Sequence, residues 1–231
     1  MIWFFYNIIF CIAYTILLPR YLIRMIRRGG YKKGFLQRIG FYGQLLSNHL
    51  HMRPRIWIHA VSVGEVFIAL RFMAELHALR KETAFVLTTT TSTGHAVAEA
   101  RMRADDILLY FPADFPIVVR HVLNTIMPLA LIIVECELWP NLIRHARKRD
   151  IPVILLNGRL SHHSYRGYKM VRPFVKRVLA CFNLICAQSK EDAQSLIELG
   201  ADTNCVKITG SAKYDIIDIP SKEHVNSIEA F

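Results

Sequence analysis

The chain has 231 residues, of which 53% are hydrophobic, so it can bury one sizeable core or two small ones. Glycine and proline contents are ordinary and no segment is of low complexity, which argues against a disordered or fibrous protein. The formal net charge of +11 is unevenly placed, because residues 1–64 hold nine Lys or Arg and no Asp or Glu. The other residues carry 20 basic and 18 acidic side chains and are nearly neutral. Five cysteines stand at irregular spacings without a CxxC pair, so we expect reduced thiols in a cytosolic domain and no structural metal site.

Residues 1–19 contain no charged side chain and are rich in Ile, Phe, Tyr and Leu. Their number is about the ~20 residues that a helix needs to cross a bilayer. Seven basic residues follow between positions 20 and 38, and excess positive charge marks the cytoplasmic side of a membrane. We therefore predict a single N-terminal anchor in the cell inner membrane with the body on the cytoplasmic face. The anchor either spans the bilayer or dips into the inner leaflet. A cleaved signal peptide would carry its charges before the apolar run.

Residues 20–54 form a basic juxtamembrane segment. Membrane topology and attraction to anionic lipid headgroups, at ~1 kcal/mol per basic group near the surface, are sufficient to explain its charge. A second interpretation is that the segment also guides an anionic lipid substrate. We expect no nucleic-acid partner, because the basic residues adjoin a membrane segment and no nucleic-acid-binding motif accompanies them.

Residues 55–216 alternate short β-branched runs with longer amphipathic stretches. Strands are expected at 56–59, 85–89, 107–111, 130–135, 153–157, 184–187 and 206–209, and helices at 66–79, 116–124, 141–149, 171–180 and 191–199. Strand runs that recur every ~25 residues with helices between them predict an α/β fold, a parallel sheet with helices on both faces. Ligands of such sheets bind at the carboxyl ends of the strands, in the loops that lead into helices.

Two of these loops carry candidate site residues near the start of a helix. The first strand leaves into Ser62-Val-Gly64-Glu65, in which Gly64 permits a tight turn and Glu65 falls near a helix N-terminus. Glu65 either complements the helix dipole or has a functional role. The second strand ends in a run of hydroxyl residues that closes with Thr93 and Gly94. That run is either a helix cap or a cradle for phosphate, carboxylate or sugar hydroxyls.

The loop after the fourth strand is the most unusual. Glu135 and Glu137 directly follow a buried strand, and the i, i+2 spacing predicts that they point to the same side. A buried acid is costly unless it is paired, so Glu135 needs a partner or a role. Trp139 and Pro140 should then start a helix that Asn141 helps to cap.

The fifth and last strands add cations to the same edge of the sheet. The fifth exits into Asn157-Gly-Arg159-Leu-Ser161, and the last ends in Gly210-Ser-Ala-Lys213. Two or three carboxylates, an Arg and a Lys along one edge suit the binding of an anionic sugar and the deprotonation of a hydroxyl.

Taken together, these motifs closely resemble those of the Kdo transferases, which add the acidic eight-carbon sugar Kdo to a lipid A precursor with CMP-Kdo as donor. The resemblance extends from the apolar leader to about residue 218, in the motif order of that family. Its most specific parts are Ser62-Val-Gly-Glu65 and Glu135-Cys-Glu-Leu-Trp-Pro-Asn141. Departures are small: Cys136 stands where Thr is usual, Gly158 where Ala is usual and Ala212 where Leu is usual.

The resemblance implies a GT-B glycosyltransferase of two Rossmann domains, with an acceptor domain that supplies the base and a C-terminal domain that binds the nucleotide sugar. This chain would be the acceptor half, with 55–216 as the Rossmann-like domain, 217–231 as the start of the interdomain linker, and the CMP-Kdo-binding domain absent. The resemblance assigns Glu65 as the proton acceptor and Glu135 and Lys213 as transition-state stabilisers of an inverting transfer. The substrate-binding candidates are Ser62, Gly64, Thr93, Gly94, Glu137, Asn157, Arg159 and Ser161.

The resemblance calls for no cofactor beyond the donor substrate CMP-Kdo, and there is no Asp-x-Asp motif to hold a metal. Three interpretations remain open at this point. The chain is a fragment of a Kdo transferase, one chain of a split transferase that pairs with a donor-binding partner, or a membrane-tethered lipid A-binding module without catalysis.

Overall fold

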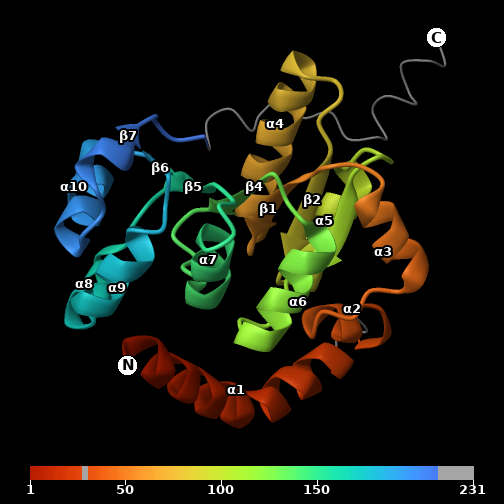
Figure 1. Ribbon diagram of the computed structural model, residues 1–231, viewed down its shortest axis with the longest axis horizontal. Helices are drawn as coiled ribbons and strands as arrows, with labels where there is room; N and C mark the ends of the chain where they lie inside the picture. The colour runs from red at the N-terminus through yellow and green to blue at the C-terminus, as the bar shows by residue number, and fades with distance from the viewer. Residues whose placement is uncertain (28–30, 213–231) are drawn as a thin grey trace.

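The computed structural model describes residues 1–27 and 31–212, in which one parallel sheet is sandwiched between two layers of helices (Figure 1). The strands are β1 Ile56–Ala60, β2 Phe85–Thr89, β3 Ile107–Tyr110, β4 Ala130–Val134, β5 Val153–Gly158, β6 Leu184–Ala187 and β7 Val206–Ile208. The helices are α1 Ile2–Arg27, α2 Tyr31–Arg38, α3 Gln44–His51, α4 Val63–Leu79, α5 Ser92–Arg101, α6 Pro116–Ile126, α7 Pro140–Arg147, α8 His162–Met170, α9 Arg172–Leu179 and α10 Lys190–Leu199, with a short 3-10 turn η1 at Thr203–Cys205.

The strand order is β3-β2-β1-β4-β5-β6-β7, and every neighbouring pair is parallel. The chain starts in the middle of the sheet at β1, moves outward to β3, then returns to place β4 on the other side of β1. The order therefore reverses between β1 and β4. In open α/β sheets this switch point leaves a crevice beyond the carboxyl ends of the two strands, where ligands bind.

Alternate side chains of the central strands β1 and β4 enter two separate cores, as the period of two in a strand requires. Trp57, Leu131 and Ile133 pack on the side covered by α3, α6, α7, α9 and α10, whereas Ile58 and Ile132 pack against α4 and α5. The strands are apolar on both faces because helices cover both faces of the sheet. The predicted fold class, a parallel sheet with helices on both faces, is confirmed.

Element boundaries differ from the prediction in a few places. The expected helix at 66–79 begins three residues earlier, at Val63, because Ser62 caps it. The expected strand at 130–135 ends at Val134, because Glu135 adopts a left-handed backbone with φ +55°. The basic segment at 20–54 was predicted without elements, but α2 and α3 lie in it.

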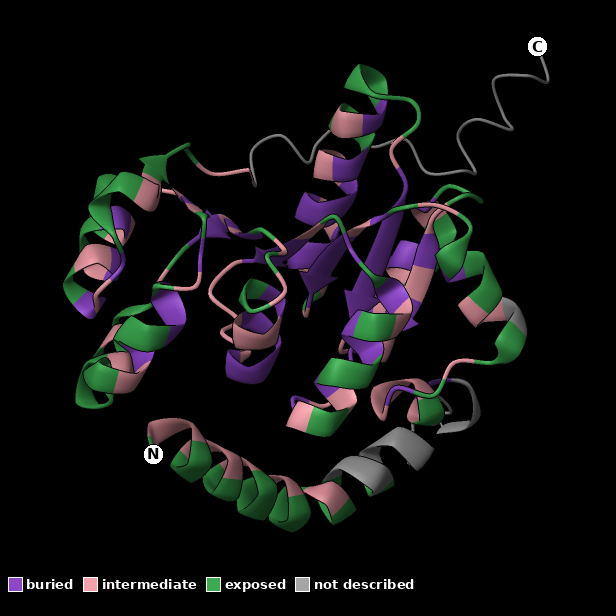
Figure 2. Ribbon diagram, viewed as in Figure 1, coloured by how far each residue is buried: buried purple, intermediate pink, exposed green. Residues whose placement is uncertain are grey.

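Helix α1 is long and apolar enough over Ile2–Arg20 to cross a membrane, and it is the candidate anchor. It lies along the surface of the body, below α6 and α7 in Figure 1. Trp3 and Tyr6 contact the Phe174 ring of α9, and Phe10 and Tyr14 contact the Phe115 ring at the start of α6. The opposite face of α1 is exposed (Figure 2), and its large apolar side chains are Phe4, Phe5, Ile8, Ile9, Ile12, Ile16 and Leu17. The helix therefore has an aromatic face on the body and a mostly aliphatic face, which also includes Phe4 and Phe5, turned outward.

A buried carboxylate joins α1 to the body. Asp114 accepts hydrogen bonds from the Tyr6 hydroxyl at 2.9 Å and from the backbone amides of Asn141 and Leu142 at 2.9 and 2.8 Å. Burial raises the pKa of Asp114 to about 7, against the lowering effect of these donors. The expectation that Asn141 helps to cap α7 is wrong, because Asp114 occupies that place. The Asn141 side chain instead donates to Asn7 of α1 at 2.8 Å.

We expect Asp114→Ala to lower the free energy of unfolding by about 3 kcal/mol, because it leaves two helix-start amides and a buried hydroxyl without acceptors. Urea unfolding of the detergent-solubilised chain, followed by circular dichroism, measures the change. Glu82→Ala, at an exposed position before β2, is the control and should stay within about 0.5 kcal/mol of the unsubstituted chain. A loss below about 1 kcal/mol for Asp114→Ala would contradict this role.

Candidate functional site

Glu65 lies at the switch point, in the first turn of α4, where it is 5% exposed. Ser62 is the N-cap of the helix: its hydroxyl accepts the Glu65 amide at 3.3 Å. The Glu65 carboxylate reaches back in turn and accepts the amides of Ser62 at 3.2 Å and Val61 at 2.8 Å. This reciprocal pair is a capping box. The carboxylate is thus held rigidly at the carboxyl end of β1, with both oxygens bonded to backbone.

The local environment makes Glu65 more basic than an ordinary glutamate. Burial raises the pKa of Glu65, and the negative charge of Glu135 raises it further. The hydrogen bonds from Val61 and Ser62 lower the pKa and oppose this rise. The helix-start bonds favour the ionised form and burial disfavours it. The net effect is upward, which suits a proton acceptor.

Glu135 and Glu137 come from β4, on the other side of the switch point. Because β4 ends at Val134 and Glu135 is left-handed, strand alternation does not place the two side chains, and the argument from i, i+2 spacing fails. They nevertheless share one environment with Glu65. Burial raises the pKa of Glu137, and the charges of Glu65 and Glu135 raise it further. The loops after β1 and β4 therefore bring the three carboxylates within electrostatic reach of one another, at the sheet edge where the sequence placed them.

The backbone at this edge is strained at two positions. Glu135, directly after β4, has φ +55°. Asn157, the last residue but one of β5, has φ +57°. Left-handed backbone is common for Asn but rare for Glu. Such conformations persist only where surrounding contacts impose them, and they cluster at functional sites. The Glu135 amide donates to the Leu156 carbonyl at 2.9 Å, which ties the end of β4 to the end of β5.

The hydroxyl-rich loop after β2 packs against the Glu65 loop. Thr91 caps α5 by accepting the Gly94 amide at 3.1 Å, and its hydroxyl donates to the Val61 carbonyl at 3.0 Å. Gly94 is buried, and a Cβ there would meet Thr91 Oγ1 at 2.9 Å. The glycine is therefore required for close packing. Thr93 is exposed in the first turn of α5, where it can meet a ligand.

Gly64 has a different role from the one predicted. It is the second residue of α4, its φ is not positive, and a Cβ would meet only Ser62 Oγ at 3.9 Å. The idea that it permits a tight turn is therefore wrong. The turn is made by Ser62, whose extended backbone precedes the helix.

The residues after β5 divide into structural and exposed ones. Asn157 is buried and its side-chain oxygen accepts the Ala212 amide at 3.0 Å, which anchors the chain just before Lys213. Ser161 caps α8 by accepting the Ser164 amide at 3.1 Å. Arg159 is exposed, and its backbone bonds the Cys136 thiol in the acidic loop. Lys213 and the expected linker at 217–231 lie outside the described residues.

An aromatic stack that sequence analysis did not single out lies beside the acidic loop. The buried His59 ring stacks on Phe111 at 3.7 Å, and Phe111 contacts Trp139 at 4.7 Å between ring centroids. Burial lowers the pKa of His59 to about 3, so the ring is neutral. Its Nδ1 lies 3.1 Å from both Thr88 O and Thr88 Oγ1. A histidine inside an otherwise apolar strand was the available signal for this packing.

Arg38 was also missed, because sequence analysis counted it only as part of the basic segment. It donates to the Thr90 carbonyl at 2.9 Å and lies over the Tyr110 ring at 4.3 Å. A cation therefore stands at the start of the hydroxyl-rich loop. Within residues 1–27 and 31–212, no group of three or more His, Cys, Asp or Glu is arranged to hold a metal ion.

Comparison with known proteins agrees with this geometry. A family described as 3-deoxy-D-manno-octulosonic-acid transferase (kdotransferase) matches residues 33–216. The chain is 31% identical over 214 residues to a 3-deoxy-D-manno-octulosonic acid transferase of Haemophilus influenzae, covering 92% of this chain and 49% of that one. It is 34% identical over 166 residues to the protein of that name from Bordetella pertussis, covering 70% and 38%. The chain thus spans about half or less of the length of these relatives.

Solved structures support the fold. A UDP-N-acetylglucosamine 2-epimerase superposes with a TM-score of 0.53 at 12% identity, covering 76% of this chain and 55% of that one. The UDP-GlcNAc 2-epimerase from Neisseria meningitidis superposes with a TM-score of 0.52 at 11% identity, covering 76% and 50%. At such identities the likeness concerns the fold alone. It agrees with the predicted Rossmann-like domain of a GT-B protein.

We expect Glu135→Gln to lower the pKa of Glu65 and of Glu137, because it removes a negative charge that raises both. Carboxyl-selective NMR titration of the labelled chain measures the two values. Glu75→Gln is the matched control: it lies on the same helix as Glu65 but is exposed and paired with Arg71. If the pKa of Glu65 is the same in the Glu135→Gln and Glu75→Gln variants, the three acids are not electrostatically coupled.

Proposed function

The chain belongs to the Kdo transferase family, and on that premise we propose that it forms the acceptor side of an inverting glycosyltransferase that moves Kdo from CMP-Kdo to a lipid A precursor. The observation that supports this proposal most directly is the group of three carboxylates at the switch point, two of which have raised pKa values. A base that accepts a hydroxyl proton near neutral pH benefits from such a rise.

In the proposed reaction Glu65 takes the proton from a primary hydroxyl of a glucosamine unit. The hydroxyl oxygen forms a bond to the anomeric carbon of Kdo as the bond from that carbon to the CMP phosphate breaks. CMP leaves with the electron pair, and the anomeric configuration inverts. The amides of Val61 and Ser62 hold the ionised carboxylate in place before the transfer. Fixing the base in this way removes the entropic cost of positioning it.

Glu135 and Lys213 would stabilise the transition state from two sides. A carboxylate near the anomeric carbon favours the positive charge that develops there. A lysine balances the Kdo carboxylate or the departing phosphate. Lys213 directly follows Ala212, which Asn157 anchors at the carboxyl end of the sheet. Arg159 and Thr93, both exposed, would contact the acceptor or the sugar.

The donor side of the reaction requires a second binding domain for CMP-Kdo. The Haemophilus influenzae relative is about twice as long as the matched region. We propose that such a domain completes the enzyme, in the same polypeptide or in a separate chain. The 231-residue chain alone should then show no Kdo transfer.

A second candidate function is lipid binding without catalysis. It is favoured by the capping box, because both oxygens of Glu65 already serve a structural role. A protonated or amide form of this side chain would lose part of the cap. The two functions are separated by a substitution that removes the charge and preserves the shape.

We expect Glu65→Gln to reduce turnover by about 10²- to 10⁴-fold in an enzyme that combines this chain with a donor-binding domain, with lipid binding retained. Transfer of labelled Kdo from CMP-Kdo generated in place measures turnover, and vesicle co-sedimentation measures binding. Glu75→Gln should leave both unchanged. Full turnover with Glu65→Gln would remove Glu65 as the base and leave lipid binding as the stronger candidate.

We further propose that α1 anchors the protein to the cytoplasmic face of the inner membrane and lies in the plane of the surface. The polar side chains of Tyr6 and Asn7 bond the body, and Trp3 contacts Phe174 and Arg144. The same residues cannot be packed on the body and also cross the hydrocarbon core as an isolated helix. The exposed aliphatic face fits a helix half-sunk in the inner leaflet, which is the second arrangement that the sequence left open.

Nitroxide labels at positions 4, 8, 12 and 16, all on the exposed face of α1, test this arrangement in anionic vesicles. An in-plane helix gives similar depths at all four, roughly 5–10 Å below the headgroups. A spanning helix gives a steady gradient of about 18 Å between positions 4 and 16, from the rise of ~1.5 Å per residue. A label at exposed Ala74 on α4 should remain in water in either case. A steady gradient would overturn the in-plane arrangement.

A further inference from the structure

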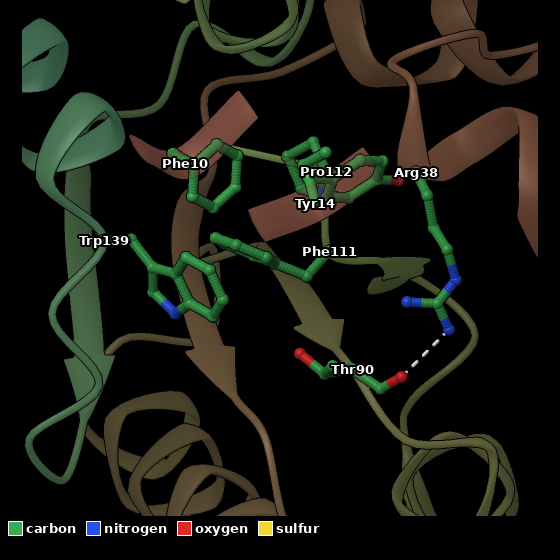
Figure 3. A pocket seen from close by; sticks show the side chains of 8 residues that line it. Phe10, Tyr14, Arg38, Thr90, Phe111, Pro112 and Trp139 are labelled. Carbon is green, nitrogen blue, oxygen red and sulfur yellow. Dashed lines mark hydrogen bonds between the residues drawn. The ribbon is translucent and has the colours of Figure 1, made fainter. Parts of the chain in front are cut away.

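A cavity of about 170 Å³ lies between α1 and the loops at the carboxyl edge of the sheet. Figure 3 shows its walls: Phe10 and Tyr14 from α1, Phe111 and Trp139 from the loops after β3 and β4, and Thr90 and Arg38 at one end. The walls are almost entirely apolar and aromatic. An apolar cavity of about 150 Å³ stays dry and can bind a molecule the size of benzene. This space can therefore take an apolar ligand of about six carbons.

The lining includes the hydroxyl of Thr90 and the indole N–H of Trp139, which are shielded from solvent and have no hydrogen-bond partner among the described residues. Buried polar atoms are nearly always satisfied, and exceptions call for a missing partner. The guanidinium of Arg38 adds a positive charge at the same end, where it donates to the Thr90 carbonyl. The ligand that fits has an apolar body and a polar, anionic end.

A second hollow of about 200 Å³ is lined by α1 alone. It shares Phe10 and Tyr14 with the first cavity and is otherwise lined by Ala13, Leu17 and Leu18 of α1. Leu17 belongs to the exposed aliphatic face of the helix. The first cavity therefore lies toward the loops at the sheet edge and the second hollow lies along α1 toward its outward face, with two side chains of the helix shared between them. A flexible hydrocarbon chain is the apolar ligand that can occupy both.

The first cavity adjoins the acidic site. Trp139 follows Glu137 by two residues, and Thr90 precedes Thr91, whose hydroxyl bonds the Val61 carbonyl beside Glu65. A ligand chain in the cavity would have its polar end directed to the loops that carry the carboxylates. This placement favours the reacting lipid over a bulk phospholipid.

We propose that the cavity between α1 and the body holds an acyl chain of the acceptor lipid, with Arg38 facing a phosphate of its headgroup. The proposal rests on the proposed function and assigns part of the acceptor site to α1. The anchor helix then has two faces with separate tasks. Its aliphatic face contacts the bilayer, and its aromatic face encloses one chain drawn out of the bilayer.

Photo-crosslinking in anionic nanodiscs tests the proposal with the whole chain. One probe is a tetraacylated glucosamine disaccharide bisphosphate with a diazirine on an acyl chain close to the headgroup, and the other is a phosphatidylglycerol with the same group at the same position. We expect the disaccharide probe to label the peptide containing Phe111 and Ala113, and phosphatidylglycerol to label only the exposed face of α1. Equal labelling of that peptide by both probes would mean a bulk lipid chain and would overturn the proposal.

Filling the cavity provides the matched substitution. Ala113→Phe should reduce labelling by the disaccharide probe at Phe111 at least tenfold, and leave labelling of the outer face of α1 unchanged. Ala74→Phe on the exposed side of α4 is the control and should change neither. Both variants must melt within a few degrees of the unsubstituted chain. Undiminished labelling in a folded Ala113→Phe protein would overturn the proposal.

A second variant tests the headgroup without filling the cavity. Arg38→Gln should weaken labelling by the bisphosphate probe several-fold more than labelling by its dephosphorylated analogue. An equal effect on both would remove Arg38 from headgroup recognition. These readouts need no sugar transfer. If crosslinking fails but the enzyme that combines this chain with a donor-binding domain still transfers Kdo, only the cavity assignment is wrong. If that combined enzyme transfers no Kdo, the proposed function itself is wrong.

Discussion

Asp114 is the buried carboxylate on which the arrangement of the site depends. It accepts the first amides of α7 and the hydroxyl of Tyr6, so one side chain fixes the start of α7 and the position of α1. The start of α7 in turn ends the loop that carries Glu135, Glu137 and Trp139. A carboxylate without these donors would be costly to bury. Asp114 can therefore be buried only because it accepts these hydrogen bonds. The same bonds connect α1, the candidate anchor, to the loop that carries Glu135 and Glu137.

The second constraint is the reversal of strand order between β1 and β4. At this point two neighbouring strands end, and the chain leaves them in opposite directions. The segment after β1 contains Glu65, and the segment after β4 contains Glu135. Glu65 is fixed by a capping box, whereas Glu135 is fixed by a left-handed backbone. The raised pKa values of Glu65 and Glu137 follow from burial and from the charges of the neighbouring carboxylates.

The membrane interpretation depends on one face of α1. Composition describes the whole helix as apolar, but its side chains differ by face: aromatic and amide groups meet the body, and aliphatic groups meet solvent. A helix with bonds to a soluble domain along its first half is part of that domain. These contacts support the proposal that a segment long enough to span a bilayer lies on the surface of the body, where it also lines a cavity.

Sequence by itself determined the strand positions, the parallel sheet and the edge that carries the chemistry, because hydrophobic period and strand-to-helix alternation are local properties. It also placed Glu65, Glu135 and Glu137 along one edge, since parallel strands end at one edge, but it did not decide how near Glu135 comes to Glu65. Tertiary structure alone decided that Asp114 and not Asn141 caps α7, that Gly94 and not Gly64 is the sterically required glycine, and that Arg38 and His59 adjoin the site. Each of these depends on contacts between residues distant in sequence, which no local pattern records.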